Sequence, residues 1–212
     1  QLVMAAAKLT GTDDDGYALF AYGMRVGADA HLREGFEAAG AISLLGASIS
    51  GELDIAGAKL TGTNSGGYAL VADGMHVGAA VLRERVEAAG AISLLSANIS
   101  RQLDMSGAKL NGTDSRGVAL AADRLHVGTD AFLSYGFEPA GAISLLGANI
   151  GGQLNMTGAK LTGTDSRGVA LVADGLHVGG DAFLREGFEA AGAIRLGGVR
   201  IDGQLVMSGA KL

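Results

Sequence analysis

The tripeptide Ala-Lys-Leu recurs along the whole chain at an almost constant interval. It begins at Ala7, Ala58, Ala108, Ala159 and Ala210, so the steps are 51, 50, 51 and 51 residues. A fixed period of this length is typical of proteins in which one structural unit stacks on the next. We therefore interpret residues 1–212 as a single domain of about four repeats.

Each repeat divides into two coils of unequal length. Apolar, polar, apolar triplets such as Leu176-His177-Val178 are typical of strands whose side chains alternate between core and solvent. The middle residues of these triplets are Arg25, Ser48, His76, Asn98, His126, Asn149, His177 and Arg200. Their spacing alternates between 22 or 23 and 28 residues. This pattern indicates a coil of 22–23 residues, with an insert of five or six residues in every second coil.

The inserts are expected in four polar segments, which are residues 10–16, 61–67, 111–117 and 162–168. Each is rich in Gly, Asp, Asn and Ser, which favour turns, so we predict a stacked row of protruding loops. Asp13, Asp14 and Asp15 offer clustered oxygens of the kind that bind Ca²⁺. The other three segments lack this cluster, and we expect a solvated acidic turn.

Composition limits both the core and the chemistry. The chain has 36 glycines, one proline (Pro139), no cysteine and 5% aromatic residues, which indicates an interior of Ala, Leu, Ile and Val. Without cysteine there are no disulfides or thiolate metal sites. The formal charge of −6 argues against a nucleic-acid partner, which needs a concentrated basic face. We find no apolar run of about 18 residues that would span a membrane and no phosphate-loop motif, so neither a membrane nor a cofactor is predicted.

The coil interpretation predicts which charged residues stack on one another in successive coils. Equivalent residues of successive parallel coils lie about 4.8 Å apart, where opposite charges stabilise a pair and like charges destabilise it. Aligning Phe-Glu-Ala with Ala-Lys-Leu gives an outward column of strictly alternating sign: Lys8, Glu37, Lys59, Glu87, Lys109, Glu138, Lys160, Glu189 and Lys211. We predict this column as a surface ladder, together with the polar column His76, Asn98, His126, Asn149 and His177.

Two further sets follow from the same alignment. A second charged column is predicted through Arg33, Asp54, Arg83, Asp104, Ser134, Asn155 and Arg185. The inward set is predicted as Leu53, Ile55, Leu60, Leu103, Met105, Leu110, Leu154, Met156 and Leu161, with Ile42, Ile92, Ile143 and Ile194 from another side.

Four blocks of five or six residues per coil predict a squarish cross-section with a short strand on each side. Ala97-Asn98-Ile99-Ser100-Arg101 and Ala148-Asn149-Ile150-Gly151-Gly152 resemble the pentapeptide-repeat family, whose motif places a small and then a Leu-like residue inward around a polar one. The resemblance implies an all-β fold, a right-handed parallel β-helix (solenoid) of about eight coils. The 51-residue unit as a whole resembles Gly-rich repeats of actinobacterial proteins without an assigned function.

The motif Asp-x-x-His is the strongest candidate for a catalytic pair in the sequence. It pairs Asp73 with His76, Asp123 with His126, and Asp174 with His177. A carboxylate can orient an imidazole as a general base, but the motif recurs where a catalyst needs one copy, and no nucleophile stands beside it. Successive histidines are two coils, or about 9.6 Å, apart, too far to share a zinc ion. We therefore predict no catalytic or metal-binding residue.

These observations predict a non-catalytic structural or protein-interaction module, a rigid rod roughly 40 Å long that presents polar ladders and a loop row to a protein partner. Three alternatives stay open. Part of the pentapeptide-repeat family mimics DNA and binds topoisomerases, although alternating charge favours that role only weakly. A carbohydrate-active β-helix enzyme would need grouped carboxylates. Finally, the chain starts and stops within a repeat, so we expect it to be a piece of a longer protein whose open ends favour head-to-tail self-association into dimers or filaments.

Overall fold

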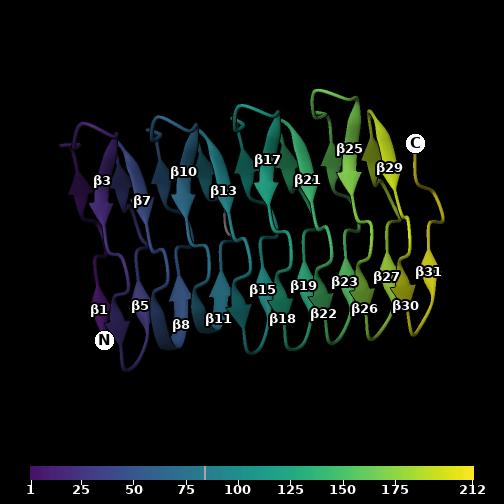
Figure 1. Cartoon of the computed structure of the whole chain (residues 1–212), viewed down its shortest axis with the longest axis horizontal. Helices are drawn as coiled ribbons and strands as arrows, with labels where there is room; N and C mark the ends of the chain where they lie inside the picture. Colours follow the sequence, from purple (N-terminus) through teal and green to yellow (C-terminus); the bar gives the residue numbers. More distant parts are fainter. Residues whose placement is uncertain (84) are drawn as a thin grey trace.

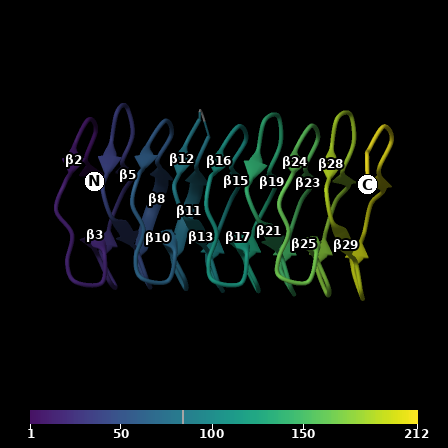
Figure 2. The same cartoon turned by 90° about the horizontal axis from the view of Figure 1, so that it is seen from above.

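The computed structural model describes residues 1–83 and 85–212. These residues form 31 short β-strands and no helix. Figure 1 shows the strands wound into coils that follow one another from the N-terminus to the C-terminus along the long axis. In Figure 2, seen from above, the same coils lie side by side. The predicted all-β, parallel β-helix of about eight coils is thereby confirmed, and its right-handedness stays a prediction.

Each coil has four sides, which we number in chain order. Side 1 holds β1 (Leu2–Val3), β5 (Ala30–His31), β15 (Leu103–Asp104), β19 (Ala131–Phe132), β23 (Leu154–Asn155), β27 (Ala182–Phe183) and β31 (Leu205–Val206). Side 2 holds β2 (Lys8–Leu9), β6 (Glu37–Ala38), β9 (Lys59–Leu60), β12 (Glu87–Ala88), β16 (Lys109–Leu110), β20 (Glu138–Pro139), β24 (Lys160–Leu161) and β28 (Glu189–Ala190).

The other two sides complete the coil. Side 3 holds β3 (Tyr17–Phe20), β7 (Ala41–Ser43), β10 (Tyr68–Val71), β13 (Ala91–Ser93), β17 (Val118–Ala121), β21 (Ala142–Ser144), β25 (Val169–Val172) and β29 (Ala193–Arg195). Side 4 holds β4 (Arg25–Val26), β14 (Asn98–Ile99), β18 (His126–Val127), β22 (Asn149–Ile150), β26 (His177–Val178) and β30 (Arg200–Ile201). Two longer strands, β8 (Ser48–Asp54) and β11 (His76–Val81), run from side 4 into side 1.

The register predicted from charge alternation is confirmed on side 2. The Cα partners there run Lys8, Glu37, Lys59, Glu87, Lys109 and Glu138, and then Lys160, Glu189 and Lys211. Ion pairs join neighbours in this column, with Nζ to Oε distances of 3.0 Å for Lys8–Glu37 and 3.4 Å for Lys109–Glu138. An exposed pair contributes at most about 1 kcal/mol, so the ladder selects the register rather than supplying most of the stability.

Pro139 interrupts the side-2 sheet between β20 and β24. At the equivalent place near the end of the chain, the N–H of Ala190 donates to the carbonyl of Lys211. Proline has no N–H to donate. The carbonyl of Lys160 instead accepts from the N–H of Thr162 at 3.1 Å. The stacking continues because the flanking bond from the Lys160 N–H to the Phe137 carbonyl, at 3.0 Å, is kept.

Side 4 carries the second predicted column. Its Cα partners run Arg25, Ser48, His76, Asn98, His126, Asn149, His177 and Arg200 without a break. This confirms the alternation of shorter and longer coils, because these residues were paired from their spacing alone.

A missing residue explains why one repeat is 50 and not 51 residues long. At the corner between sides 4 and 1, Asp29, Asp130 and Asp181 each accept a hydrogen bond from a backbone N–H of the next coil, with distances of 2.7–2.9 Å. The second repeat has Val77-Gly78-Ala79-Ala80 and no aspartate at this corner. Without the extra residue, β11 runs through the corner as one strand.

The core is a continuous column of small and branched apolar side chains. The predicted inward set is confirmed, since all of these residues are buried except Ile194, which is partly buried against the same cluster. Phe36, Phe137 and Phe188 are fully buried at the corner before side 2. Burial of this apolar surface, at about 25 cal/mol per Å², is the main force that holds the coils together.

The second predicted charged column is wrong by two residues. Asp54 has His31 and Val81 as its Cα partners, so Arg33 and Arg83 lie two residues beyond the column, and Ser134 and Arg185 are displaced in the same way. The arginine side chains reach back from the corner: Nη1 of Arg33 lies 3.0 Å from Oδ2 of Asp54. The charge alternation therefore reflects side-chain reach and not backbone pairing.

Charge reversal within the side-2 ladder should destabilise the rod. In Lys109→Glu a third carboxylate would stand between Glu87 and Glu138, with a spacing of about 4.8 Å. We expect the free energy of unfolding to fall by about 1 kcal/mol at low salt and by less at high salt. Urea unfolding at two salt concentrations measures this. Lys109→Gln, which removes attraction without adding repulsion, should lose less, and a loss independent of salt would contradict the electrostatic interpretation.

Candidate functional site

The four inserted loops share one hydrogen-bond pattern. We number them loop 1 (10–16), loop 2 (61–67), loop 3 (111–117) and loop 4 (162–168) and call them together the loop row. In loop 3, Oδ1 of Asp114 accepts from the N–H of Arg116 at 2.8 Å and of Val118 at 3.0 Å. Asp13, Asn64 and Asp165 accept in the same way from residues two and four positions further on. One side chain thus closes each turn.

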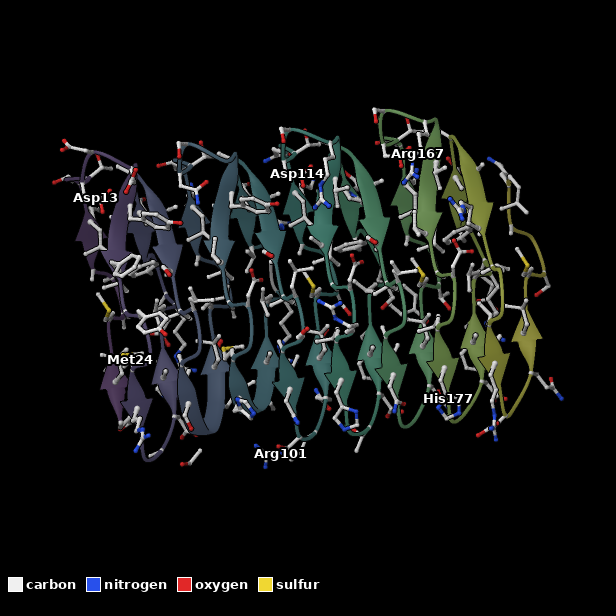
Figure 3. The ribbon with its side chains drawn as sticks, in the orientation of Figure 1. Asp13, Met24, Arg101, Asp114, Arg167 and His177 are labelled. Carbon is white, nitrogen blue, oxygen red and sulfur yellow. The ribbon has the colours of Figure 1, made fainter. Side chains whose placement is uncertain are left out.

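Successive loops also touch one another. The N–H of Ser65 donates to the carbonyl of Asp15 at 3.1 Å, and the N–H of Ser166 donates to that of Arg116 at 3.2 Å. Figure 3 shows Asp13, Asp114 and Arg167 along one long edge of the rod, each on a different loop. The predicted row of stacked loops is therefore a continuous ridge beside side 3.

Two loop aspartates have lowered pKa values. Burial alone would raise the pKa of Asp114, but hydrogen bonds from Val118 and Arg116 outweigh it and hold the value below the ordinary 3.8. The pKa of Asp165 is lowered by the N–H of Val169 first and then, against the effect of burial, by Arg167. Each carboxylate also pairs with the arginine of its own loop, at 2.8 Å for Asp114–Arg116 and 3.2 Å for Asp165–Arg167.

Loop 1 carries the acidic cluster considered for Ca²⁺. Asp13 uses Oδ1 within its own turn, while Asp14 and Asp15 are exposed. Within residues 1–83 and 85–212, no three His, Cys, Asp or Glu side chains are grouped as a metal site requires.

The outer face of side 3 is lined by a column that alternates between apolar and polar residues. Its Cα partners run Phe20, Ser43, Val71, Ser93, Ala121, Ser144, Val172 and Arg195. The residues just before them on the same strands, such as Leu70 and Ile92, lie in the core. Because side chains alternate along a strand, this column points away from the core.

The aspartates of Asp-x-x-His face side 3 and not their histidines. Asp73 accepts hydrogen bonds from the hydroxyl of Ser93 and, at 3.0 Å, from the N–H of Leu95. Asp123 accepts from the hydroxyl of Ser144. In the fourth repeat the serine is replaced by Arg195, whose Nη2 lies 2.6 Å from Oδ2 of Asp174. These partners were missed from the sequence, although the recurring Ala-Ile-Ser at 41–43, 91–93 and 142–144 was a signal for them.

The histidines belong to side 4. Nδ1 of His76 lies 3.1 Å from the carbonyl oxygen of Gly74, and Nε2 of His177 lies 3.1 Å from Oδ2 of Asp202. His177 lies on the edge of the rod opposite the loop row (Figure 3). The predicted ladder residues therefore occupy sides 2 and 4, and their part in binding stays a prediction.

Side 3 has a small apolar cluster of its own. Val118, Ala121 and Ala142 form a buried cluster separate from the core, with Leu95 packed against it. Beside this cluster, between loops 3 and 4, is a cavity of about 290 Å³. Its lining is Arg116, Val118, Asp123, Ala142, Ser144, Leu146, Asp165, Ser166, Arg167 and Val172.

Large apolar side chains are exposed on or next to this face. The exposed fractions are 61% for Phe20, 68% for Tyr22 and 45% for Leu146. Phe20 lies on β3, and the other two lie in the turns that follow side-3 strands. Leu196, 38% exposed, takes the inward position that Leu145 has in an earlier coil, and it is exposed because β29 is the last strand of the side-3 sheet. We call the outer face of side 3, with these turns and the loop row, the side-3 face, and it is our candidate functional site.

The chain matches no protein-family model, no curated protein and no solved structure. The described residues include no helix that is long and apolar enough to cross a membrane.

The second residue of each loop offers a matched test of how the loops pack. A Cβ on Gly112 would overlap the carbonyl oxygen of Ala89 in the coil beneath, whereas a Cβ on Gly11 would have no atom within 4 Å. We expect Gly112→Ala to lower the free energy of unfolding by at least about 2 kcal/mol and Gly11→Ala to change it by less than about 0.5 kcal/mol. Urea unfolding measures both; equal effects would show that the loop stem does not rest on the coil beneath.

Asp114 should make loop 3 sensitive to acid. Since its folded pKa lies below the ordinary 3.8, its ionised form stabilises the fold above that pH, and this contribution disappears as the pH falls through the folded value. Asp114→Asn keeps the turn acceptor, as Asn64 does in loop 2. We expect this variant to be less stable by roughly 1 kcal/mol at pH 7, with the difference closing below about pH 4.

Unfolding curves from about pH 2.5 to 7 test this dependence. Asp14→Asn, at an exposed position of loop 1, is the control and should show no comparable difference. A gap between wild type and Asp114→Asn that stays constant across this range would rule out the carboxylate as its source.

Proposed function

We propose that this chain is a non-catalytic protein-interaction module, a rigid repeat rod that binds a protein partner through the side-3 face. The observation that carries the proposal is the exposure of Phe20, Tyr22 and Leu146 along side 3, with Leu146 lining the same cavity as Val118 and Ala142 of the apolar cluster outside the core. Exposed apolar groups beside a cavity are typical of interaction sites.

The charged ladder of side 2 is a weaker candidate for binding. Its lysines and glutamates already neutralise each other along the column, as the Lys109–Glu138 and Lys211–Glu189 pairs do. A partner that approached this side would have to compete with those pairs and would gain little.

A non-catalytic role is supported by the partners of the Asp-x-x-His aspartates. Asp73 and Asp123 each accept a hydrogen bond from the serine hydroxyl of the next coil. These hydrogen bonds join one coil to the next. This arrangement fits a structural role on side 3, where each aspartate ties one turn to the coil above it.

We also infer that the coils are of the pentapeptide-repeat type and right-handed. The support is local: Ala97 and Ile99 are buried on either side of Asn98, and Ala148 and Ile150 on either side of Asn149. That is the inward, outward, inward order of the family motif, here on side 4.

Affinity capture with matched variants tests the proposed surface. The immobilised wild-type chain would capture a partner from a lysate of the organism that encodes it. We expect Tyr22→Ser with Leu146→Ser to lose that partner, because exposed apolar contacts of the side-3 face are removed. The control neutralises one ladder pair, Lys109→Gln with Glu138→Gln, which places no like charges side by side, and should retain it. Loss in the ladder variant with retention in the side-3 variant would assign binding to side 2 instead.

A further inference from the structure

Tyrosines fill the gaps between the first loops of the row. The hydroxyl of Tyr17, which follows loop 1, lies 2.8 Å from Nδ2 of Asn64 in loop 2. The hydroxyl of Tyr68, which follows loop 2, donates to Oδ2 of Asp114 in loop 3 at 3.0 Å. Each ring therefore spans from the exit of one loop to the turn-closing residue of the next.

The third repeat breaks this pattern. The residue after loop 3 is Val118, and its short side chain cannot reach Asp165, the turn-closing residue of loop 4. Val118 and Asp165 both line the 290 Å³ cavity. The cavity thus lies where the ring of a tyrosine would lie if the third repeat followed the first two. Figure 3 labels Asp114 on loop 3 and Arg167 on loop 4, the two loops between which this cavity lies.

Oδ2 of Asp165 is the hydrogen-bond acceptor that a tyrosine hydroxyl in this cavity would meet. Oδ2 of Asp114 receives three donors, which are the Tyr68 hydroxyl and Nε and Nη2 of Arg116. Among the described residues, Oδ2 of Asp165 receives only Nε of Arg167, at 3.2 Å. Asp165 is 8% exposed, so a nearly buried carboxylate oxygen is left with unused acceptor capacity beside the cavity.

We propose that the cavity between loops 3 and 4 binds the side chain of a tyrosine from a protein partner, with the ring against Val118, Ala142 and Val172 and the hydroxyl donating to Oδ2 of Asp165. The partner's tyrosine would complete the row that Tyr17 and Tyr68 begin. This inference deepens the proposed function and rests on it, because it names the side chain that the side-3 face recognises.

The lining favours a neutral phenol over other groups. The volume is near the lower end of the range for small-ligand pockets, roughly 300–1,000 Å³, which suits one ring. Arg116 and Arg167 line the cavity and can lie against an aromatic face. Two arginines and two aspartates line the cavity, and Arg116 and Arg167 each pair with the aspartate of their own loop, so the lining holds no excess positive charge for a carboxylate or phosphate. Burial and the bond to Asp114 raise the pKa of Tyr68, so a phenol in this setting stays protonated and donates.

The probe is N-acetyl-L-tyrosinamide, followed by methyl NMR shifts of Val118, Ala142 and Val172. We expect saturable binding with a dissociation constant on the order of millimolar and about tenfold weaker binding of the phenylalanine analogue, which lacks the hydroxyl. Val118→Tyr should abolish binding, because the chain's own ring then fills the cavity.

A gain of function is the stronger test. Tyr68→Val should open the equivalent cavity between loops 2 and 3 and add a second probe site, detected at the methyl groups of Ala91 and Ala121. Val118 shows that valine is accommodated at this place in the repeat. If wild type binds no probe, if Val118→Tyr still binds it, or if Tyr68→Val gains no second site, the tyrosine assignment is wrong.

The capture experiment separates this inference from the proposed function. A captured partner that is lost in Tyr22→Ser with Leu146→Ser but retained in Val118→Tyr would overturn the tyrosine site and leave the side-3 face as the binding surface. Probe binding without any captured partner would overturn the proposed function instead. Loss of the partner in both variants supports the two together.

Discussion

Hydrogen bonding between in-register parallel coils is the constraint on which the rest of the structure depends. Each strand serves two neighbours, so no side of a coil can change its length without breaking the ladder above and below it. The chain varies in length in two places: in the loops between sides 2 and 3, where no ladder runs, and at the corner before Ala80, where one residue is missing and the pairing of β11 with β8 shifts register. Pro139 shows the consequence of a change within a strand, since the sheet of side 2 divides there.

The same constraint decides what could be predicted from the sequence. Residues on strands recur with the period of the coil, so the pairing of Lys59 with Glu87 and of His76 with Asn98 follows from counting. The spacing of repeated residues predicts the backbone register of the strands. It does not predict where a side chain points at a corner, where the chain turns. Arg33 reaches Asp54 from two residues beyond the column, and Asp73 turns from its histidine to Ser93. The errors therefore lie at corners, where periodicity ends.

The candidate site could not be predicted in this way, because it depends on a difference between repeats. The residues that follow the four loops are Tyr17, Tyr68, Val118 and Val169, and this change from tyrosine to valine is visible in the sequence. The sequence does not show that this change opens a cavity, because that depends on each loop ending beside the turn-closing residue of the next loop. In an array of similar units, a site distinct from all others arises where one unit departs from the pattern that its neighbours keep.

Sides 2 and 3 differ, for an energetic reason, in what they could offer a partner. Charges that alternate along side 2 are satisfied by their neighbours, so they penalise slippage by one coil and offer a partner little net attraction. Apolar side chains on side 3 have no such neighbours and gain about 25 cal/mol per Å² when a partner covers them. Because the ladder and the core hold the coils in one register, the geometry of the side-3 face is fixed before any partner arrives. A partner of the kind we propose would therefore not have to offset the entropy of ordering that face.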